Sequence, residues 1–185
     1  MKASLFERVG NFTPINYTRV ERGGESYSQT EKFTRRTLQL CVWTYKRLQN
    51  TNQTARLLRD VIDFVLRRYH KYAIAENFGG HYREVGIKPG EKTDFEHVIP
   101  AALARDLLIH DRLTVEEAMN IPTCMVRKKN HKKLNSSKLS KTTPDIFNFW
   151  DRYKILKVKI ETHDGKSVDM ENWNLEQHYK YFNVE

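Results

Sequence analysis

Glu96, His97 and His131 are the residues of this sequence whose types and spacing are best suited to chemistry. Glu96 and His97 are adjacent in a short apolar run over residues 95–100, which we expect to be extended. Neighbouring side chains on a strand point to opposite faces, so both can serve one site only where the strand ends or bends. Residues 123–127 predict a second strand, and His131 falls in the first turn of a helix expected over residues 130–139. Two strands and a helix would then converge on these side chains.

The residue types suit acid–base and metal chemistry. An imidazole with an ordinary pKa near roughly 6.5 is available as a base at neutral pH, whereas a lysine is not. A carboxylate paired with an imidazole binds magnesium weakly and manganese, nickel or zinc more readily. The other histidines have neighbours that helix faces, loops or a turn explain, and we expect no functional role for them: His70, His81, His110, His163 and His178.

Short strings around these residues carry a family resemblance. Glu-His-Val-Ile-Pro at 96–100, Asn-Ile-Pro at 120–122 and His-Lys-Lys-Leu at 131–134 are similar to strings of the HNH nucleases, a branch of the ββα-metal, or His-Me finger, group. In that family an acidic residue and a histidine end the first strand, an asparagine lies in the intervening segment, and a histidine or asparagine projects from the helix. The resemblance covers residues 95–135.

The resemblance implies a role for each matching residue. His97 would be the general base that takes a proton from the water attacking a phosphodiester. Glu96 and His131 would hold one divalent metal ion, Mg²⁺ or Mn²⁺ in the first place, with Zn²⁺ or Ni²⁺ as alternatives. Asn120 would orient His97 or its loop. Asn135, four residues beyond His131 on the same helical face, would be a further metal ligand.

A simpler interpretation needs no chemistry: Glu96 and His97 would end a helix, and His131 would belong to a solvated basic face. The distribution of charge favours the nuclease instead. Residues 121–143 contain no acidic side chain, and a nuclease must neutralise phosphates beside the bond it cuts. The basic residues of this run, which we expect to bind nucleic acid, are Arg127, Lys128, Lys129, Lys132, Lys133, Lys138 and Lys141.

Composition limits the classes of function that the chain can have. The chain has 185 residues and a net charge of +9, from 32 Lys and Arg against 23 Asp and Glu, which favours a polyanionic partner. Its two cysteines form no C-x-x-C pair, so there are too few cysteines for a disulfide scaffold or for a zinc site built from cysteines. No apolar stretch long enough for a membrane span or a signal peptide is evident, and we expect a cytoplasmic protein of a bacterial or phage-infected cell with no membrane partner.

The remaining patterns predict an α+β fold with a mostly helical body, an embedded ββα-metal motif and a C-terminal β-hairpin followed by a helix. Apolar periodicity predicts helices from Thr30 to Leu48 and over 54–76, and further helices over 101–109, from Thr114, over 144–153 and over 172–182. Alternation over 156–161 predicts a strand, and Asp164-Gly165 a hairpin turn. We divide the chain into an N-terminal arm (1–28), a helical hairpin (29–80), the HNH-like region (81–143) and a C-terminal segment (144–185).

The sequence therefore predicts a metal-dependent endonuclease that hydrolyses DNA, of the kind found in phages, mobile elements or restriction systems. Two alternatives stay open: a non-catalytic basic nucleic-acid-binding protein, and a nuclease toxin that acts on RNA. The sequence does not separate DNA from RNA, and a homodimer is left open as well.

Overall fold

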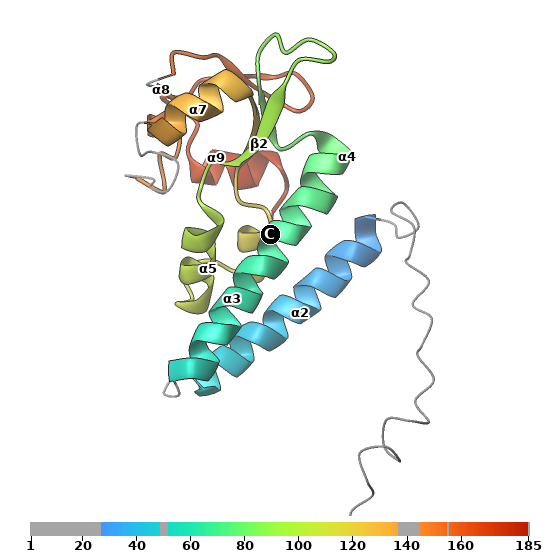
Figure 1. The fold of residues 1–185 in the computed structure, drawn as a ribbon, viewed down its shortest axis with the longest axis vertical. Coiled ribbons are helices and arrows are strands. Elements are labelled where there is room, and N and C mark those ends of the chain that lie inside the picture. Colours follow the sequence, from blue (N-terminus) through green and yellow to red (C-terminus); the bar gives the residue numbers. More distant parts are fainter. Residues whose placement is uncertain (1–26, 49–51, 137–144, 155, 185) are drawn as a thin grey trace, which may run out of the picture.

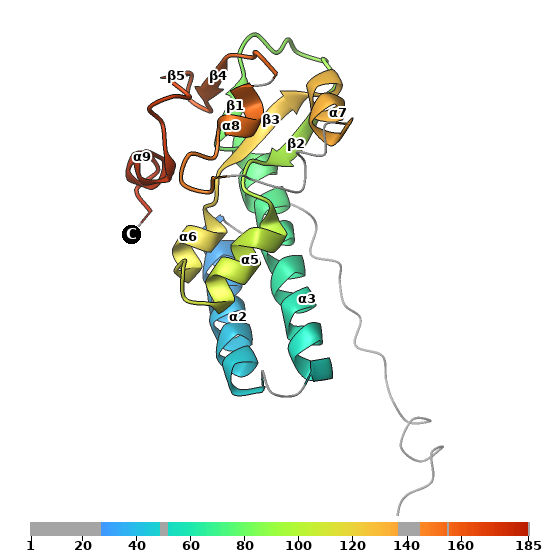
Figure 2. The ribbon, with the colours of Figure 1, turned by 90° about the vertical axis from the view of Figure 1, so that its left-hand side faces the viewer.

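The computed structural model describes residues 27–48, 52–136, 145–154 and 156–184. It confirms a mixed α+β fold, in which a helical layer lies at one end of the molecule and a five-stranded mixed sheet at the other (Figures 1 and 2). The predicted N-terminal arm lies outside the described residues, except that residues 27 and 28 begin the first helix. Lys138 and Lys141 also lie outside them.

The helical layer is a hairpin of two long helices with two shorter helices packed against it. These helices are α2 (Tyr27–Leu48), α3 (Asn52–Tyr69), α5 (Ala101–Ile109) and α6 (Val115–Met119). Leu38 and Val42 of α2 meet Ile62 and Leu66 of α3 in one buried cluster. The predicted cap of α6 is also confirmed, since the Thr114 side chain accepts a hydrogen bond from the Glu117 backbone N–H.

The second long helix changes its winding near its end. The sequence predicts one helix over 54–76, but α3 passes at His70 into the π-helix η1 (His70–Ala75) and then into a short α4 (Glu76–Phe78). Gly79 ends α4 with a left-handed φ of 70°, which a residue without a side chain adopts at little cost. A π turn within a helix frequently lies at a functional position, and here it begins with a fully buried histidine.

The sheet has the strand order β2-β3-β1-β4-β5, and β1 and β3 run parallel while the other pairs are antiparallel. The strands are β1 (Tyr82–Glu84), β2 (Thr93–His97), β3 (Thr123–Arg127), β4 (Ile160–Thr162) and β5 (Ser167–Val168). In the β2–β3 pair Glu96 lies opposite Cys124 and His97 opposite Thr123. Strand β2 is an edge of the described sheet, so one of its sides is not paired with another of these strands.

Helix α7 (Lys128–Ser136) follows β3 directly and packs against β2 and β3, completing the predicted order of two strands and a helix. It begins two residues earlier than expected. Leu134 anchors it in the core of the sheet layer, where it joins Val126 and Trp150. Because Glu96 and His97 end a strand, the interpretation that they end a helix is wrong.

Two predictions for the C-terminal segment need correction. The helix expected over 144–153 is reduced to α8 (Asp151–Lys154), because the Asp145 carboxylate accepts the backbone N–H groups of Phe147 and Asn148 and holds a turn instead. The strand expected over 156–161 is reduced to β4, because Lys157 has a left-handed φ of 52° that interrupts an extended chain. The turn between β4 and β5 and the final helix α9 (Leu175–Tyr181) follow the prediction.

The two layers keep separate apolar cores. The sheet layer buries an aromatic cluster that includes Tyr82, Phe149, Trp150 and Tyr153, and the helical layer buries the aliphatic cluster of α2, α3, α5 and α6. No helix in the described ranges is both long and apolar enough to cross a membrane. The end of β2 is a place where both layers contribute polar side chains, and the candidate site lies there.

Candidate active site

Strand β2 presents different groups on its two faces. Asp94 and Glu96, two residues apart, both contact His131 of α7. Phe95 and His97 share the other face, where their rings contact each other with centroids 5.4 Å apart. The strand therefore separates a carboxylate–imidazole cluster on one side from a second imidazole on the other.

The imidazole of His131 lies between two carboxylates. Its Nδ1 atom is 2.9 Å from Asp94 Oδ2, and its Nε2 atom is 2.9 Å from Glu96 Oε2. The structure thus brings together Glu96 and His131, the two metal ligands that the sequence suggests. It adds Asp94, which was not among the predicted ligands, although its spacing of two from Glu96 on a strand is a signal that they share a face.

A buried arginine holds the other side of Glu96. The Arg152 side chain is fully buried, and its Nη2 atom donates both to Glu96 Oε1 and to the backbone carbonyl of His97. These bonds tie the last two residues of β2 to α8. Nothing in the sequence near Arg152 indicates this partner, since the two side chains are 56 positions apart.

Glu96 and His131 are in direct contact, since 2.9 Å between Oε2 and Nε2 is the distance of a charge-assisted hydrogen bond. A carboxylate and an imidazole are ligand types that divalent metals accept, and an ion held by this pair would take the place of that contact. The contact from His131 Nδ1 to Asp94 is the carboxylate contact that orients metal-binding histidines. No three His, Cys, Asp or Glu side chains of the described chain are grouped to hold an ion, so two protein ligands would need water and phosphate oxygens beside them.

On the opposite face, His97 meets a second histidine. Its Nε2 atom is 3.0 Å from Nδ1 of His70, the first residue of the π-helix. Burial lowers the pKa of His97 well below its ordinary value, and nearby His70, Arg67 and Arg152 lower it further. The imidazole is therefore neutral and able to accept a proton at pH 7.

His70 is itself fixed on both sides. Its Nε2 atom lies 3.2 Å from the carbonyl oxygen of Ala118 and 2.9 Å from that of Met119, the last residues of α6. Burial lowers the pKa of His70 to about 4, against an opposing effect of the two carbonyls. The sequence predicts no role for His70, because nothing in its helical neighbourhood shows that the fold brings it to His97.

The two asparagines of the predicted site lie elsewhere in the network. The Asn120 amide donates to the Glu116 carbonyl at 2.9 Å and so caps the end of α6, while its own carbonyl accepts a bond from His178 Nε2 at 2.6 Å. Asn135 is exposed on α7. The described contacts therefore connect Asn120 to the helical layer and to α9 rather than to the His97 ring.

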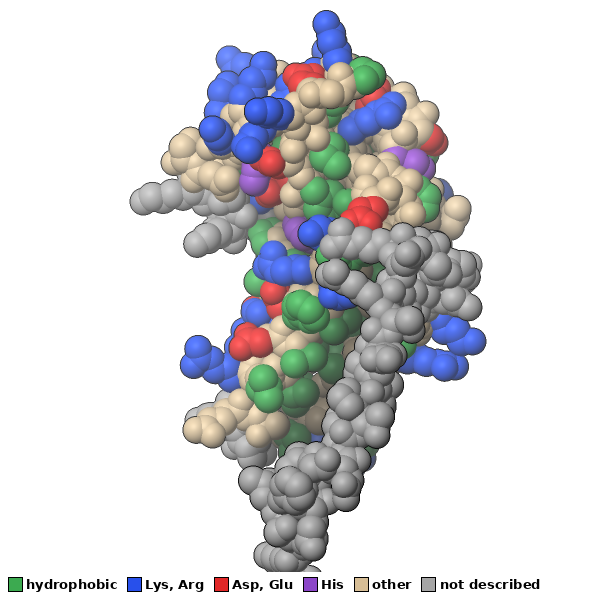
Figure 3. Space-filling model, turned by 45° about the vertical axis from the view of Figure 1, so that its right-hand side comes forward, with side chains coloured by type: hydrophobic (Ala, Val, Ile, Leu, Met, Phe, Trp, Pro, Cys, Tyr) green, Lys and Arg blue, Asp and Glu red, His purple; other side chains and the backbone are tan. Residues whose placement is uncertain are grey.

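Exposed lysines cover the outer side of α7. Figure 3 shows Lys and Arg side chains gathered at the upper end of the molecule, above acidic and histidine side chains. The lysines of α7 that are exposed are Lys128, Lys129, Lys132 and Lys133. Because His131 is on the inner side of the same helix, these cations lie close to the Glu96–His131 pair.

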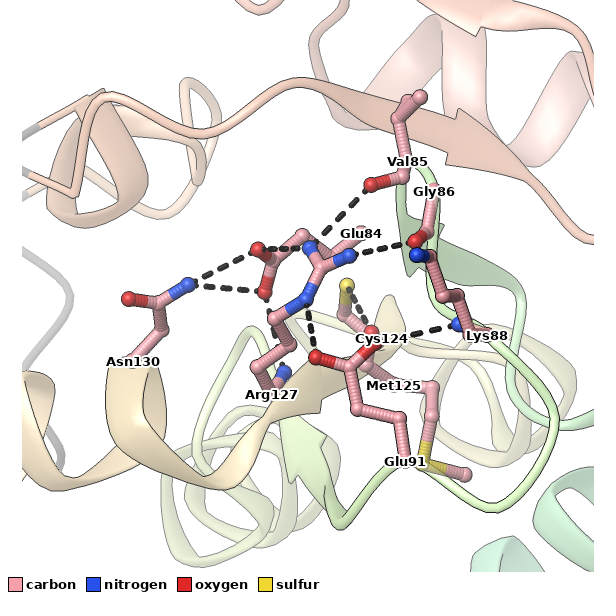
Figure 4. Close-up of polar contacts among 9 residues, drawn as sticks. All are labelled: Glu84, Val85, Gly86, Lys88, Glu91, Cys124, Met125, Arg127 and Asn130. Atoms are coloured by element: carbon pink, nitrogen blue, oxygen red, sulfur yellow. Dashed lines mark hydrogen bonds and ion pairs between the residues drawn. The ribbon is translucent and has the colours of Figure 1, made fainter.

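Arg127 differs from the lysines because its guanidinium is used within the fold. It forms an ion pair with Glu84, donates to Glu91 Oε1 at 2.7 Å and to the Gly86 carbonyl at 2.6 Å, and also reaches the Val85 carbonyl (Figure 4). The bond from Arg127, together with the backbone N–H of Lys88, lowers the pKa of the Glu91 carboxyl. Arg127 thus joins the β1–β2 connection to the end of β3, and its binding to nucleic acid stays a prediction.

The same network fixes the start of α7. Both carboxylate oxygens of Glu84 lie 2.9 Å from Asn130 Nδ2, and Oε2 also accepts the Arg127 backbone N–H at 3.0 Å (Figure 4). Glu84 and Asn130 are both buried. The position of His131, next to Asn130, therefore depends on a buried carboxylate–amide pair that the sequence analysis did not identify.

The cavity nearest to β2 is separate from these side chains. A cavity of about 340 Å³ lies at the other end of β2, against Thr93 and Met125, and none of Glu96, His97 and His131 lines it. Comparisons with known protein families, with curated proteins and with solved structures found no match.

The Glu84–Asn130 pair generates a stability prediction. Asn130→Asp places a second carboxylate against Glu84 in a buried position, and we expect it to lower the free energy of unfolding at pH 7 by about 2–3 kcal/mol. Urea denaturation measures the change. Asn135→Asp, on the exposed side of the same helix, is the control and should change stability by less than about 0.5 kcal/mol. Equal effects of the two substitutions would contradict a structural role for the pair.

Proposed function

We propose that this protein is a metal-dependent endonuclease that hydrolyses DNA phosphodiester bonds at the end of β2. The observation that carries the proposal is the pairing of Glu96 with His131 across the strand–helix junction, at 2.9 Å, with His97 on the reverse face of the same strand. This agrees with the resemblance of residues 95–135 to HNH nucleases.

The placement of the two groups on opposite faces suits an in-line displacement. In such a reaction the attacking water and the leaving oxygen lie on opposite sides of the phosphorus. A phosphodiester across the unpaired edge of β2 would have His97 towards the water and the Glu96–His131 pair towards the leaving oxygen. Because neighbouring side chains alternate, one phosphodiester can meet both groups only at the end of the strand, and His97 is the last residue of β2.

Each residue then has a defined task. His97 accepts the proton of the attacking water, and Asp94 orients His131 through Nδ1. A divalent cation held by Glu96 and His131 would stabilise the charge that develops on the phosphate and on the leaving 3′ oxygen. The α7 lysines neutralise flanking phosphates, and a bound phosphate next to His97 would raise the pKa of its imidazole towards the operating range.

The first prediction concerns cleavage. Purified protein should cut plasmid DNA with Mg²⁺ or Mn²⁺ and stop when EDTA is added. His97→Ala should lower the rate by about 100- to 10,000-fold, which is the usual contribution of a positioned general base. Agarose-gel assays of plasmid and of total RNA, each with and without metal, measure this.

The control for that substitution is His110→Ala, an exposed histidine at the end of α5, which should leave cleavage unchanged. DNA binding and thermal unfolding of both variants must match the parent. DNA binding without any metal-dependent cleavage would favour the non-catalytic alternative, and cleavage of RNA alone would favour the toxin. Either outcome would overturn the proposal.

A second prediction isolates the metal site. Asp94→Asn keeps an oxygen that accepts from His131 but removes the negative charge, and it should weaken Mn²⁺ binding by about 10- to 100-fold. Calorimetric titration with Mn²⁺ measures the affinity. Glu171→Gln, an exposed carboxylate that pairs with Lys154, should leave it unchanged. The assignment would be refuted by an Mn²⁺ affinity that survives both Asp94→Asn and His131→Ala.

A third prediction concerns the lysines. The slope of log binding constant against log salt concentration should fall by about 0.9 for each lysine that contacts a phosphate of duplex DNA. The double substitution Lys132→Gln and Lys133→Gln should therefore reduce the slope by about 1.8. Lys180→Gln, exposed on α9, is the control. Fluorescence anisotropy at several salt concentrations gives the slopes, and an unchanged slope in the double variant would show that DNA binds elsewhere.

A further inference from the structure

The contact between His70 and His97 joins the two layers of the fold. His70 begins the π-helix and belongs to the helical layer, whereas His97 ends β2 in the sheet layer. His70 is fully buried, and its ring and that of His97 meet edge to face with centroids 5.0 Å apart. A contact of this kind can determine which nitrogen of His97 carries the proton.

The direction of the hydrogen bonds follows from the backbone carbonyl groups that His70 Nε2 contacts. The carbonyl oxygens of Ala118 and Met119 can only accept, so Nε2 of His70 must carry a hydrogen. A neutral His70 then has its lone pair on Nδ1, and burial favours the neutral form. Since that lone pair is 3.0 Å from Nε2 of His97, the hydrogen between the rings belongs to His97.

We infer that His70 is a positioning residue that holds His97 in the tautomer protonated on Nε2, so that Nδ1 is the nitrogen that accepts the proton of the attacking water. This inference rests on the proposed function for its catalytic part. The tautomer itself is a property of the protein alone, and it can be measured without metal or substrate. The two claims can therefore fail separately.

The first test is nuclear magnetic resonance of the full chain labelled with ¹⁵N, at a pH where His97 is neutral. Long-range ¹H–¹⁵N spectra should show His97 protonated on Nε2 and His70 protonated on Nε2. A scalar coupling between His97 Nε2 and His70 Nδ1 should be detectable across the hydrogen bond. A His97 protonated on Nδ1, or a mixture of both tautomers, would overturn the inference without any substitution.

Two substitutions of His70 then distinguish the loss of its hydrogen-bond acceptor from the loss of its ring. The Asn side chain places an oxygen close to the position of Nδ1, so His70→Asn should keep the Nε2–H tautomer of His97. The Gln side chain reaches towards the Ala118 and Met119 carbonyls instead. His70→Gln should therefore keep a donor to these carbonyls and lose the acceptor for His97 Nε2–H. We expect a mixed tautomer of His97 in His70→Gln only.

The matched control is His178→Gln, which alters a second buried histidine that donates through Nε2 to a backbone carbonyl. It should leave the His97 tautomer unchanged even where it lowers stability. If His178→Gln shifts the tautomer as much as His70→Gln does, the effect is a general loosening of the fold and the inference is wrong.

Cleavage kinetics test the catalytic part. His70→Gln should lower kcat by about 10- to 100-fold, as misplacement of a catalytic group does, with KM for DNA unchanged. His70→Asn should recover most of this loss. A His70→Gln variant that cuts at the parental rate would overturn the positioning role. A parent protein that cuts no nucleic acid would refute the proposed function, and the spectra alone would then decide whether His70 sets the tautomer.

Discussion

The carboxylate of Glu96 is the interaction on which the site depends. One oxygen meets His131 of α7, and the other meets the buried guanidinium of Arg152 on α8. Breaking a buried ion pair by removing one partner costs about 3–5 kcal/mol, because a charge is left without compensation. Glu96 is therefore a structural residue as well as a candidate ligand. Loss of activity on its replacement would not separate the two roles, whereas Asp94 and His131 probe the metal site more selectively.

The second constraint is the alternation of side chains along β2. It sends Glu96 towards α7 and His97 towards His70, so each face of one short strand needs its own support. Helix α7 supplies that support on one face, and the π-helical end of the helical layer supplies it on the other. The connection between β2 and β3, which contains α5 and α6, is therefore part of the arrangement, because the end of α6 provides the carbonyl groups that fix His70.

Much of the local structure could be predicted from the sequence, since it depends on short-range patterns. Helix α5, strand β3 and the capping box of α6 lie where periodicity and Thr114 place them. The site was predictable only where the contacts involve β2, β3 and α7. Arg152 and His70 reach it from distant segments, and their neighbours in the sequence give no sign of it.

Side-chain type alone does not show which basic residues form ion pairs within the fold. Arg127 stands in the basic run next to Lys128, but it pairs with Glu84 and Glu91, whereas the lysines after it are exposed. The difference follows from position. Arg127 ends a strand opposite the β1–β2 connection, and Lys128 begins a helix whose outer side faces solvent.

The use of a neutral histidine behind His97 has an electrostatic consequence. A carboxylate in the position of His70 would also orient the ring, but its charge would favour the imidazolium form and raise the pKa of His97. A neutral imidazole aligns the ring through one hydrogen bond without adding that charge. The direction of the bond is set by two carbonyl oxygens that cannot donate, so it does not reverse while His70 stays neutral. The contact with His70 thus aligns the ring, whereas burial is the main reason that the pKa of His97 is low.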